Sequence, residues 1–210
     1  MRKSTIEQNE KRKKEIVDAC EKLYQTTSFK EVTLKEIAKR TSLTRTSIYN
    51  YFQTKEEIFL ALLKHEYELW IEELEIIIRS NKKLTKEKFA QKIAKSLEHR
   101  EQLLKIMSMN MYDMEANSRM ERLVEFKLAF GKSLNVMFKC VEKFFPNSNA
   151  NNNKKFIYQF FPFIYGIYPY TEVTKKQKKA MLKAGIDYNY ISIYQITYNC
   201  LLQLITGLVK

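Results

Sequence analysis

Hydrogen-bonding side chains are concentrated in a short segment, residues 44–50, beside the apolar residues Leu43 and Ile48. The spacing predicts a helix whose apolar positions face inward and whose polar positions face away from them. Donor and acceptor groups at the N-terminal end of an exposed helix are suited to reading base edges in the major groove of DNA. The five polar side chains are Thr44, Arg45, Thr46, Tyr49 and Asn50.

The residues before this segment predict the element that positions it. Thr33 and Glu36 match a capping box, so a first helix is expected to begin one residue after Thr33. Ala38 is small enough for another helix to cross closely, and Ser42 occupies the turn between them. With a second helix over residues 44–51, the spacing fits a helix-turn-helix.

The same stretch carries a longer pattern of apolar, aromatic and polar residues at fixed spacing. Its members are Phe29, Val32, Thr33, Ile37, Ala38, Ser47, Ile48, Tyr49, Tyr51, Phe52, Lys55 and Glu56. The pattern resembles the DNA-binding domain of TetR-type transcriptional regulators over residues 10–60. The chain has Ser42 where that family usually has Gly, which makes a left-handed turn more costly, and Tyr51 where His is frequent.

The resemblance implies an all-α fold with two domains. Residues 1–54 would form a three-helix helix-turn-helix domain, joined to a larger helical ligand-binding and dimerisation domain over residues 55–210. It implies a homodimeric repressor that binds palindromic double-stranded operator DNA. An effector would shift the long helix beginning at Lys55, which would change the separation of the two recognition helices.

Roles for individual DNA-facing residues follow from their chemistry. Arg45 is expected to make a bidentate contact with guanine. The neighbouring polar side chains of residues 44–50 would contact base edges or nearby phosphates. Phosphate contacts are expected at Thr33, Tyr51 and Lys55, where two helix N-termini also favour anions.

Composition supports nucleic-acid binding and argues against catalysis. The formal net charge is +13, and residues 1–55 hold thirteen Lys and Arg against seven Asp and Glu. The first 130 residues contain no Gly, so a phosphate-binding loop or dinucleotide fingerprint is excluded there. The two His and three Cys are too scattered for a metal site or a catalytic triad, so we expect neither cofactor nor enzymatic activity. The thiols are expected to be reduced core residues, namely Cys20, Cys140 and Cys200.

The rest of the chain reads as helices. Thr54 with Glu57, and Ser118 with Glu121, match capping boxes that would open two long helices. An Asn-rich stretch over residues 147–153 is expected to be a solvated loop. The helices are expected over residues 10–26, 55–80, 86–99, 102–114, 118–145, 156–169, 175–183 and 189–208.

Methionine and aromatic residues in the second domain are candidates for an effector pocket. Methionine is flexible and polarisable, and therefore suits a cavity for varied apolar molecules, although the same residues also serve as adaptable core. Pro162 is expected to kink the aromatic helix and open space beside it. The candidates for binding a hydrophobic effector are Met107, Met111, Met114, Phe126, Phe130, Phe160, Phe163 and Tyr165.

The last predicted helix is a candidate dimer interface. Its apolar side chains are expected to pack against their copies in a second chain as part of a four-helix bundle, although burial within one chain is the alternative. The interface candidates are Tyr194, Tyr198, Leu201 and Ile205.

Alternatives from other classes remain at this stage. Basic charge alone would also suit a sequence-tolerant architectural DNA-binding protein without an effector. An enzyme with an appended helix-turn-helix is disfavoured because no His, Cys or Gly constellation is present. No apolar run reaches the ~18 residues of a membrane span, and the N-terminus lacks a signal-peptide core, so we expect a cytoplasmic protein without membrane partners.

Overall fold

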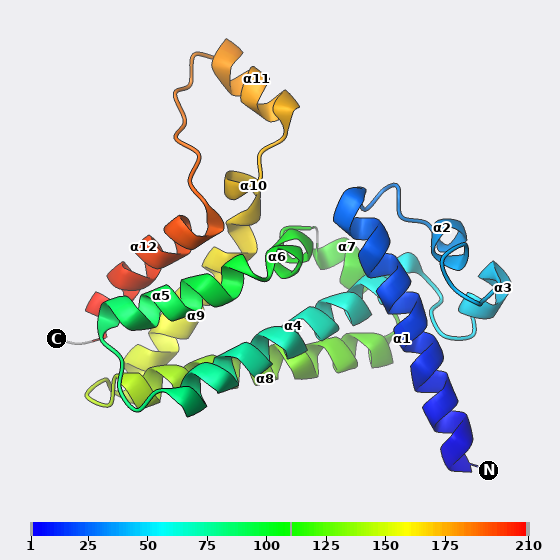
Figure 1. Cartoon of the computed structure of the whole chain (residues 1–210), viewed down its shortest axis with the longest axis horizontal. Helices are drawn as coiled ribbons and strands as arrows, with labels where there is room; N and C mark the ends of the chain where they lie inside the picture. The colour runs from blue at the N-terminus through cyan, green and yellow to red at the C-terminus, as the bar shows by residue number, and fades with distance from the viewer. Residues whose placement is uncertain (1, 110, 209–210) are drawn as a thin grey trace. The chain divides into compact units, whose positions relative to one another are not determined.

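The computed structural model describes residues 2–109 and 111–208, with side chains from residue 5 onward. Over this part of the chain there are twelve helices and no strand, which confirms the all-α class (Figure 1). The chain forms two compact units. Unit 1 comprises Met1–Glu66 and Asn110–Phe130, and unit 2 comprises Tyr67–Met109 and Gly131–Lys210. Two helices, α4 (Lys55–Ser80) and α8 (Met120–Phe144), contribute residues to both units.

Unit 1 is built around the three N-terminal helices. These are α1 (Arg2–Thr26), α2 (Leu34–Ala38) and α3 (Arg45–Ile48), joined by the start of α4, by α7 (Met111–Ala116) and by the start of α8. Its core is aliphatic and aromatic: Tyr24 meets Phe59 edge to face with ring centroids 4.9 Å apart. Side chains with 1% exposure or less include Ile16, Cys20, Ile37, Ile48, Phe52 and Phe59.

Unit 2 packs its helices around aromatic and small side chains. Helix α12 (Ile193–Thr206) lies along α5 (Lys86–Glu98), where the fully buried Ala90 and Ala94 permit a close approach. Trp70 is fully buried and lies 5.9 Å from Phe161, centroid to centroid. The remaining helices are α6 (Glu101–Met107), α9 (Ala150–Gly166), α10 (Tyr168–Thr171) and α11 (Lys175–Lys183).

Several helix boundaries differ from those expected. The described part of α1 begins at Arg2 instead of residue 10, and the segment predicted as one helix over residues 102–114 forms α6 and α7. Ser118 does not cap α8: its hydroxyl donates to the carbonyl of Met114 at 2.7 Å, at the end of α7. That side chain is therefore used by the preceding helix.

The Asn-rich stretch is a helix start and not a solvated loop over its whole length. Asn149 caps α9 through its side chain, which accepts a hydrogen bond from the Asn152 backbone at 2.9 Å. Asn153 is 2% exposed and lies in the core, because helical periodicity turns it inward. The helix continues through Pro162, whose ring is exposed.

Within the described residues, no helix is long and apolar enough to cross a membrane. The same residues contain no group of three or more His, Cys, Asp or Glu arranged to hold a metal ion. All three cysteines are free. Burial raises the pKa of Cys20 and of Cys140 to about 12, so both thiols stay protonated near neutral pH.

Candidate nucleic-acid interface

The helix-turn-helix is assembled by two side-chain caps and two isoleucines. The Thr33 hydroxyl accepts from the Glu36 backbone at 3.2 Å, and the Thr44 hydroxyl accepts from the Ser47 backbone at 3.1 Å. Each cap satisfies a donor that a short helix would leave unpaired. Ile37 and Ile48 are fully buried and hold α2 and α3 together. Both helix starts lie where the sequence placed them.

The turn between α2 and α3 is held from α1. The Ser42 backbone donates to the Glu15 carboxylate at 2.5 Å, and the Arg12 guanidinium donates to the Ser42 hydroxyl. The backbone hydrogen bond from Ser42 is the main cause that lowers the pKa of Glu15. No described residue other than Gly has a positive φ, so Ser42 avoids the left-handed conformation that is costly for a residue with a side chain. The hydrogen bonds with Glu15 and Arg12 hold Ser42 in this turn, so the turn does not depend on the conformational freedom of a glycine.

The residues expected to read bases are solvent-facing. Arg45, Thr46, Tyr49 and Asn50 are exposed, and the Arg45 guanidinium donates to the Tyr49 hydroxyl at 3.3 Å. Helix α3 is shorter than predicted and ends at Ile48, so Tyr49 and Asn50 lie in the turn that follows it. Thr44 is also exposed, but its hydroxyl serves the cap and contacts the Ser47 hydroxyl at 2.8 Å.

The three expected phosphate contacts lie in different environments. Thr33 is exposed at the start of α2, whereas Tyr51 is half-buried. The Lys55 ammonium donates to the Phe29 carbonyl at 2.9 Å and lies 3.9 Å from the centre of that ring. A phosphate contact by Lys55 would therefore compete with a contact that anchors the connector between α1 and α2.

Helix α1 adds side chains that the motif did not point to. A cleft of about 500 Å³ lies between the start of α1 and the end of the helix-turn-helix. Basic residues in the first turns of α1 were the only signal for it in the sequence. The cleft is lined by Ile6, Asn9, Glu10, Lys13, Asn50 and Tyr51.

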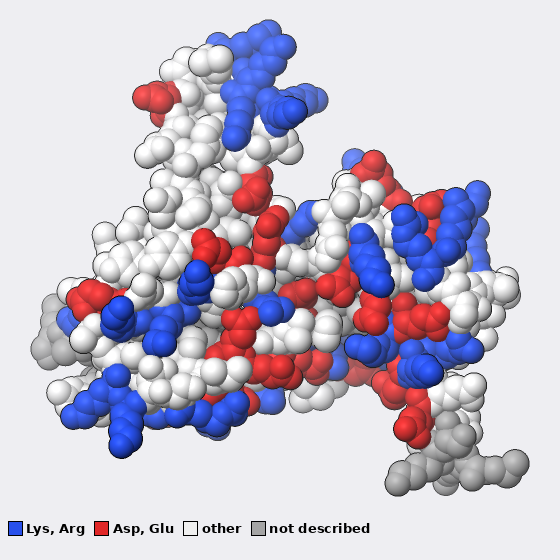
Figure 2. Space-filling view, viewed as in Figure 1, with Lys and Arg blue, Asp and Glu red and all other residues white. Residues whose placement is uncertain are grey.

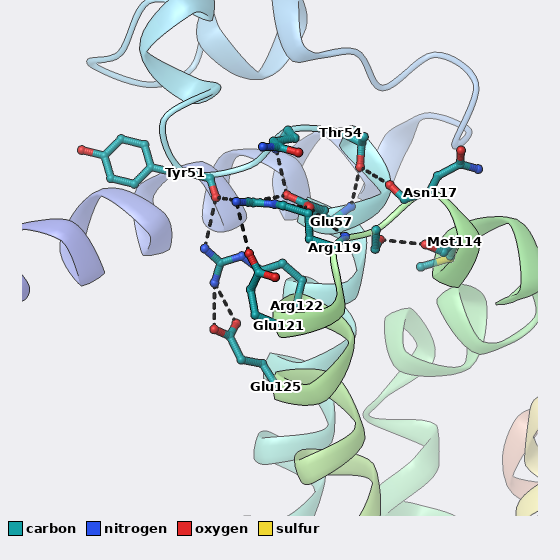
Figure 3. Close-up of polar contacts among 11 residues, drawn as sticks. Tyr51, Thr54, Glu57, Met114, Asn117, Arg119, Glu121, Arg122 and Glu125 are labelled. Carbon is teal, nitrogen blue, oxygen red and sulfur yellow. Dashed lines mark hydrogen bonds and ion pairs between the residues drawn. The ribbon is translucent and has the colours of Figure 1, made fainter.

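An ion pair between the buried Glu57 and the partly exposed Arg119, at the junction of α4, α7 and α8, supports the base of the helix-turn-helix (Figure 3). Glu57 is 1% exposed, and its carboxylate accepts from the Arg119 guanidinium at 2.7 and 2.8 Å and from the Arg119 backbone at 3.0 Å. The same carboxylate accepts from the Gln53 backbone at 2.8 Å. Burial acts to raise the pKa of Glu57, but these hydrogen bonds outweigh it and hold the pKa below its ordinary value.

The junction also holds the backbone that follows the recognition helix. The carbonyl of Tyr51 accepts from Arg119 at 3.2 Å and from Arg122 at 3.3 Å. The Thr54 hydroxyl donates to the Asn117 carbonyl at 2.9 Å (Figure 3). Residues 117–122 therefore hold the chain between α3 and α4 in place through hydrogen bonds. Sequence reasoning missed these contacts, because the partners are more than 60 positions apart.

The proposed effector residues are divided between the two units. Met111, Met114, Phe126 and Phe130 belong to unit 1, whereas Met107, Phe160, Phe163 and Tyr165 belong to unit 2. Within unit 2, Phe160 lies 6.3 Å from Phe163 in a near-parallel arrangement. Their role in binding an effector stays a prediction.

Polar groups lie inside the aromatic interior of unit 2. The Tyr67 and Tyr165 hydroxyls are 2.9 Å apart, and the Trp70 indole donates to the Ser96 hydroxyl at 3.0 Å. Tyr67 is fully buried, and burial raises its pKa well above the ordinary value. Each of these polar groups is therefore paired with another one inside the apolar interior of unit 2.

The candidate dimer residues on α12 do not share one environment. Leu201 and Ile205 are fully buried within the chain, so their side chains are not available to a partner. Tyr194 and Tyr198 are half-exposed and stack with centroids 5.8 Å apart at 10°. On α9, which packs against α12, Tyr158 is 78% exposed.

Comparison with known proteins places both parts of the chain. Residues 16–62 match a family described as bacterial regulatory proteins, tetR family. Residues 64–210 match a family described as tetracyclin repressor-like, C-terminal domain. A comparison with curated protein sequences found no match.

Solved structures share the fold at low sequence identity. The transcriptional regulator FadR from Bacillus subtilis, in complex with stearoyl-CoA, has a TM-score of 0.59 and 19% identity, covering 92% of this chain and 97% of its own. A putative regulator from Mesorhizobium loti has a TM-score of 0.58 and 15% identity, with coverages of 95% and 96%. The fatty acid degradation regulator FadR from Bacillus halodurans has a TM-score of 0.55 and 14% identity, with coverages of 90% and 97%.

Proposed function

The chain belongs to the TetR family of DNA-binding transcriptional regulators, and we propose that it is a ligand-responsive repressor that binds a palindromic operator as a homodimer. Members of this family regulate transcription and are not enzymes. One observation carries the proposal for specific binding. The exposed set Arg45, Thr46, Tyr49 and Asn50 is presented on a helix-turn-helix whose caps and turn are satisfied within the chain.

The residues of this set have separate roles in DNA binding. Arg45 would leave the Tyr49 hydroxyl to contact guanine, since one weak hydrogen bond at 3.3 Å exchanges readily for a bidentate one. Thr44 would act through its cap and donate its backbone amide to a phosphate. Lys55 would anchor the Phe29 connector, so its phosphate contact is proposed as secondary to that role.

The junction at Glu57 and Arg119 supports a route from effector to DNA. Helices α4 and α8 begin in unit 1 and supply residues to unit 2. The start of α8 and the residues just before it hold the Tyr51 carbonyl and the Thr54 hydroxyl. A ligand that shifts either helix would move the backbone beside α3 and change the spacing of the two recognition helices. Regulation then requires no contact between ligand and DNA.

A hydrophobic small molecule is the proposed effector. The aromatic interior of unit 2, with the Tyr67–Tyr165 hydroxyl pair and the Trp70 indole, supports an apolar body with one polar group. The Bacillus subtilis relative was solved with stearoyl-CoA, so a long-chain acyl-CoA is the first compound to test.

Homodimerisation is proposed through the outward face of α9 and α12. Tyr158, Tyr194 and Tyr198 supply aromatic side chains that are exposed or half-exposed, while the deeper residues of α12 complete the core of the chain. Aromatic groups of this kind are enriched at interfaces. The proposed interface therefore keeps the two tyrosines of α12 from the sequence interpretation.

Operator binding can be tested with DNA selected from random duplexes. The homodimer should prefer a palindrome over its isolated half-site at matched salt, because two recognition helices then bind together. Arg45→Ala should relax the preference at one base pair and weaken binding by about 1–3 kcal/mol. The matched control is Arg40→Ala, an exposed arginine at the end of α2, which should alter only the salt dependence.

Two outcomes would contradict specific bivalent binding. Equal affinity for the palindrome and for its half-site would show that the two recognition helices of a homodimer do not bind DNA together. Equal affinity for all sequences would instead support the architectural DNA-binding protein. For the effector, stearoyl-CoA should change Trp70 emission and release the operator, with each ligand lowering the affinity for the other by the same factor; coenzyme A alone serves as the control.

A further inference from the structure

One segment of unit 2 carries a helix that is exposed over most of its surface. Residues 168–192, called the arm below, comprise α10, α11 and the links on either side of α11. Figure 1 shows α11 held away from α5, α9 and α12 on these two links. None of the nine residues of α11 is buried. Helix α11 therefore forms although none of its side chains is buried in a hydrophobic core.

Helix α11 is nevertheless well defined by its ends. Thr174 and Gln177 form a complete capping box at its start, in which the Thr174 backbone donates to the Gln177 side chain at 2.9 Å. At its end, Gly185 has φ +67°, and the Ile186 backbone donates to the Met181 carbonyl at 3.0 Å. This is a Schellman motif, which closes a helix without help from tertiary packing.

Apolar groups lie on both sides of the arm. One side is a cleft of about 380 Å³, within the size range of a binding pocket. Elsewhere on the arm, Leu182 is 80% exposed and Ile186 is 51% exposed. The same segment thus offers an apolar hollow and apolar projections. The cleft is lined by Pro169, Tyr170, Val173, Gln177, Ala180, Met181, Ala184, Tyr188 and Tyr190.

The tip of the arm is basic. Helix α11 has no acidic residue in its first turn, where the helix dipole is positive and lysines are unfavourable. Among the described residues, no ion pair within 4.0 Å involves an α11 lysine; Lys178 lies 5.0 Å from the centre of the Tyr190 ring. In Figure 2 the lysines of α11 form one of the blue areas of the view. They are Lys175, Lys176, Lys178, Lys179 and Lys183.

The base of the arm is acidic. The Tyr168 hydroxyl donates to the Glu101 carboxylate at 3.4 Å, which brings α6 to the start of the arm. Burial and the nearby Glu101 both raise the pKa of Glu172, and Lys178 only partly offsets them. At the base, Glu101 and Glu172 repel one another, with Lys105 near Glu101 and Lys178 near Glu172, whereas at the tip the α11 lysines repel one another.

We propose that a second copy of this chain covers the arm, so that the lysines of each α11 meet Glu101 and Glu172 of the other copy and Leu182 enters the other cleft. This rests on the homodimer of the proposed function. A two-fold axis requires a surface that complements itself, and antiparallel arms place each basic tip on an acidic base. Both charge clusters and both apolar features then receive partners in one contact.

Continuity with α12 favours a second copy over other occupants. The arm ends at Ser192, which caps α12, two residues before Tyr194 on the proposed dimer face. An anionic small molecule would match the lysines and the cleft, but it would leave Leu182 exposed and the two carboxylates without a basic partner from outside the chain. An anionic membrane would attract the lysines of α11 but would leave the carboxylates at the base of the arm without a partner.

The first test exchanges the charges between two chains. Chain one carries Lys176→Glu and Lys178→Glu, and chain two carries Glu172→Lys and Glu101→Gln. Each chain alone should dimerise about tenfold more weakly than the wild type, because like charges then meet at both contacts. An equimolar mixture should form heterodimers near the wild-type affinity, since both contacts become attractive again. Sedimentation equilibrium with one size-tagged chain measures this, and circular dichroism confirms that each variant is helical.

Lys82→Glu with Lys83→Glu makes the same charge change at exposed positions between α4 and α5, and it is the matched control. A carbodiimide, which joins lysine to carboxylate, should link an α11 lysine to Glu172 between ¹⁴N- and ¹⁵N-labelled chains. The proposal fails if those links form only within one chain, or if chain one alone dimerises like the control.

Two further measurements separate the ways of failing. A dimer that persists in both charge variants but is lost in Tyr198→Glu would keep the proposed α12 interface and remove the arm from it. Saturable binding of the anionic dye 8-anilinonaphthalene-1-sulfonate that is lost in Ala180→Trp, with dimerisation unchanged, would assign the cleft to a small anion and overturn the proposal. A wild-type chain that is monomeric at all concentrations would remove the homodimer itself.

Discussion

Charged side chains have opposite environments in two regions of the molecule. These regions are the junction of α4, α7 and α8 in unit 1 and the arm of unit 2. At the junction, the buried carboxylate of Glu57 is surrounded by donors from Arg119 and Gln53, all within 3.0 Å. At the arm, the five lysines of α11 and the carboxylates Glu101 and Glu172 at its base are exposed, and no residue of α11 is buried. The first region is complete within one chain, and the second is not.

The difference indicates where each region contributes free energy. A buried, fully hydrogen-bonded ion pair contributes little net stability but penalises any other arrangement, so it fixes the backbone around Tyr51 in one position. Exposed lysines contribute almost nothing to the stability of the monomer. Their attraction for carboxylates can instead stabilise the contact with a second copy of the chain. The junction is thus suited to transmitting a shift of α4 or α8 to the recognition helix, whereas the arm is suited to binding a second copy of the chain.

The largest expected effect comes from breaking the junction. Arg119→Ala should lower the free energy of unfolding by about 3 kcal/mol, because the Glu57 carboxylate is left buried without its partner. Urea titration followed by circular dichroism measures the change. The double variant Arg119→Met with Glu57→Leu should recover part of the loss, since neither charge then remains but the Gln53 and Arg119 backbone donors lose their acceptor. An equal loss in the single and double variants would show that the ion pair is not its cause.

Acid should weaken the junction in a defined pH range. The folded pKa of Glu57 lies below its ordinary value of 4.5, so its contribution is full above 4.5 and is lost as pH falls through the folded pKa. Between the two values the free energy of unfolding should fall by up to about 1.4 kcal/mol per pH unit from this group. Glu57→Gln should flatten that part of the profile, while Glu98→Gln, at an exposed position at the end of α5, should not. Parallel profiles for all three proteins would contradict this assignment.

The smallest effect is expected in the arm. Lys176→Glu with Lys178→Glu should change the free energy of unfolding of the monomer by less than about 0.5 kcal/mol, because these side chains are exposed. The measurement is urea unfolding at a concentration below the dimer dissociation constant. A loss as large as that of Arg119→Ala would show that the arm belongs to the core, and the contrast between the two regions would disappear.

Local signals in the sequence predicted the parts that local hydrogen bonds define. Thr33 caps α2, as its spacing from Glu36 predicted, and α11 has the bounds expected from its composition. Such caps involve partners three positions apart, so the residue pattern contains the whole interaction. The family assignment rests on the same stretch, and the matched families confirm it.

Burial of individual residues was harder to predict, because one apolar stripe does not say which neighbour covers it. Leu201 and Ile205 looked suited to a partner chain, but α5 and α9 surround them within unit 2. Asn153 looked solvated in an Asn-rich stretch, yet it lies in the core because α9 begins before it.

The sequence by itself determined the all-helical class, the helix-turn-helix and the set of polar residues that face away from its core, since these depend on period, caps and residue type. Only the tertiary structure decided that Glu57 meets Arg119, that Glu15 holds the turn at Ser42, and that no residue of α11 is buried. These contacts join residues far apart in the chain, and the physical reason is that packing, unlike capping, depends on every helix at once.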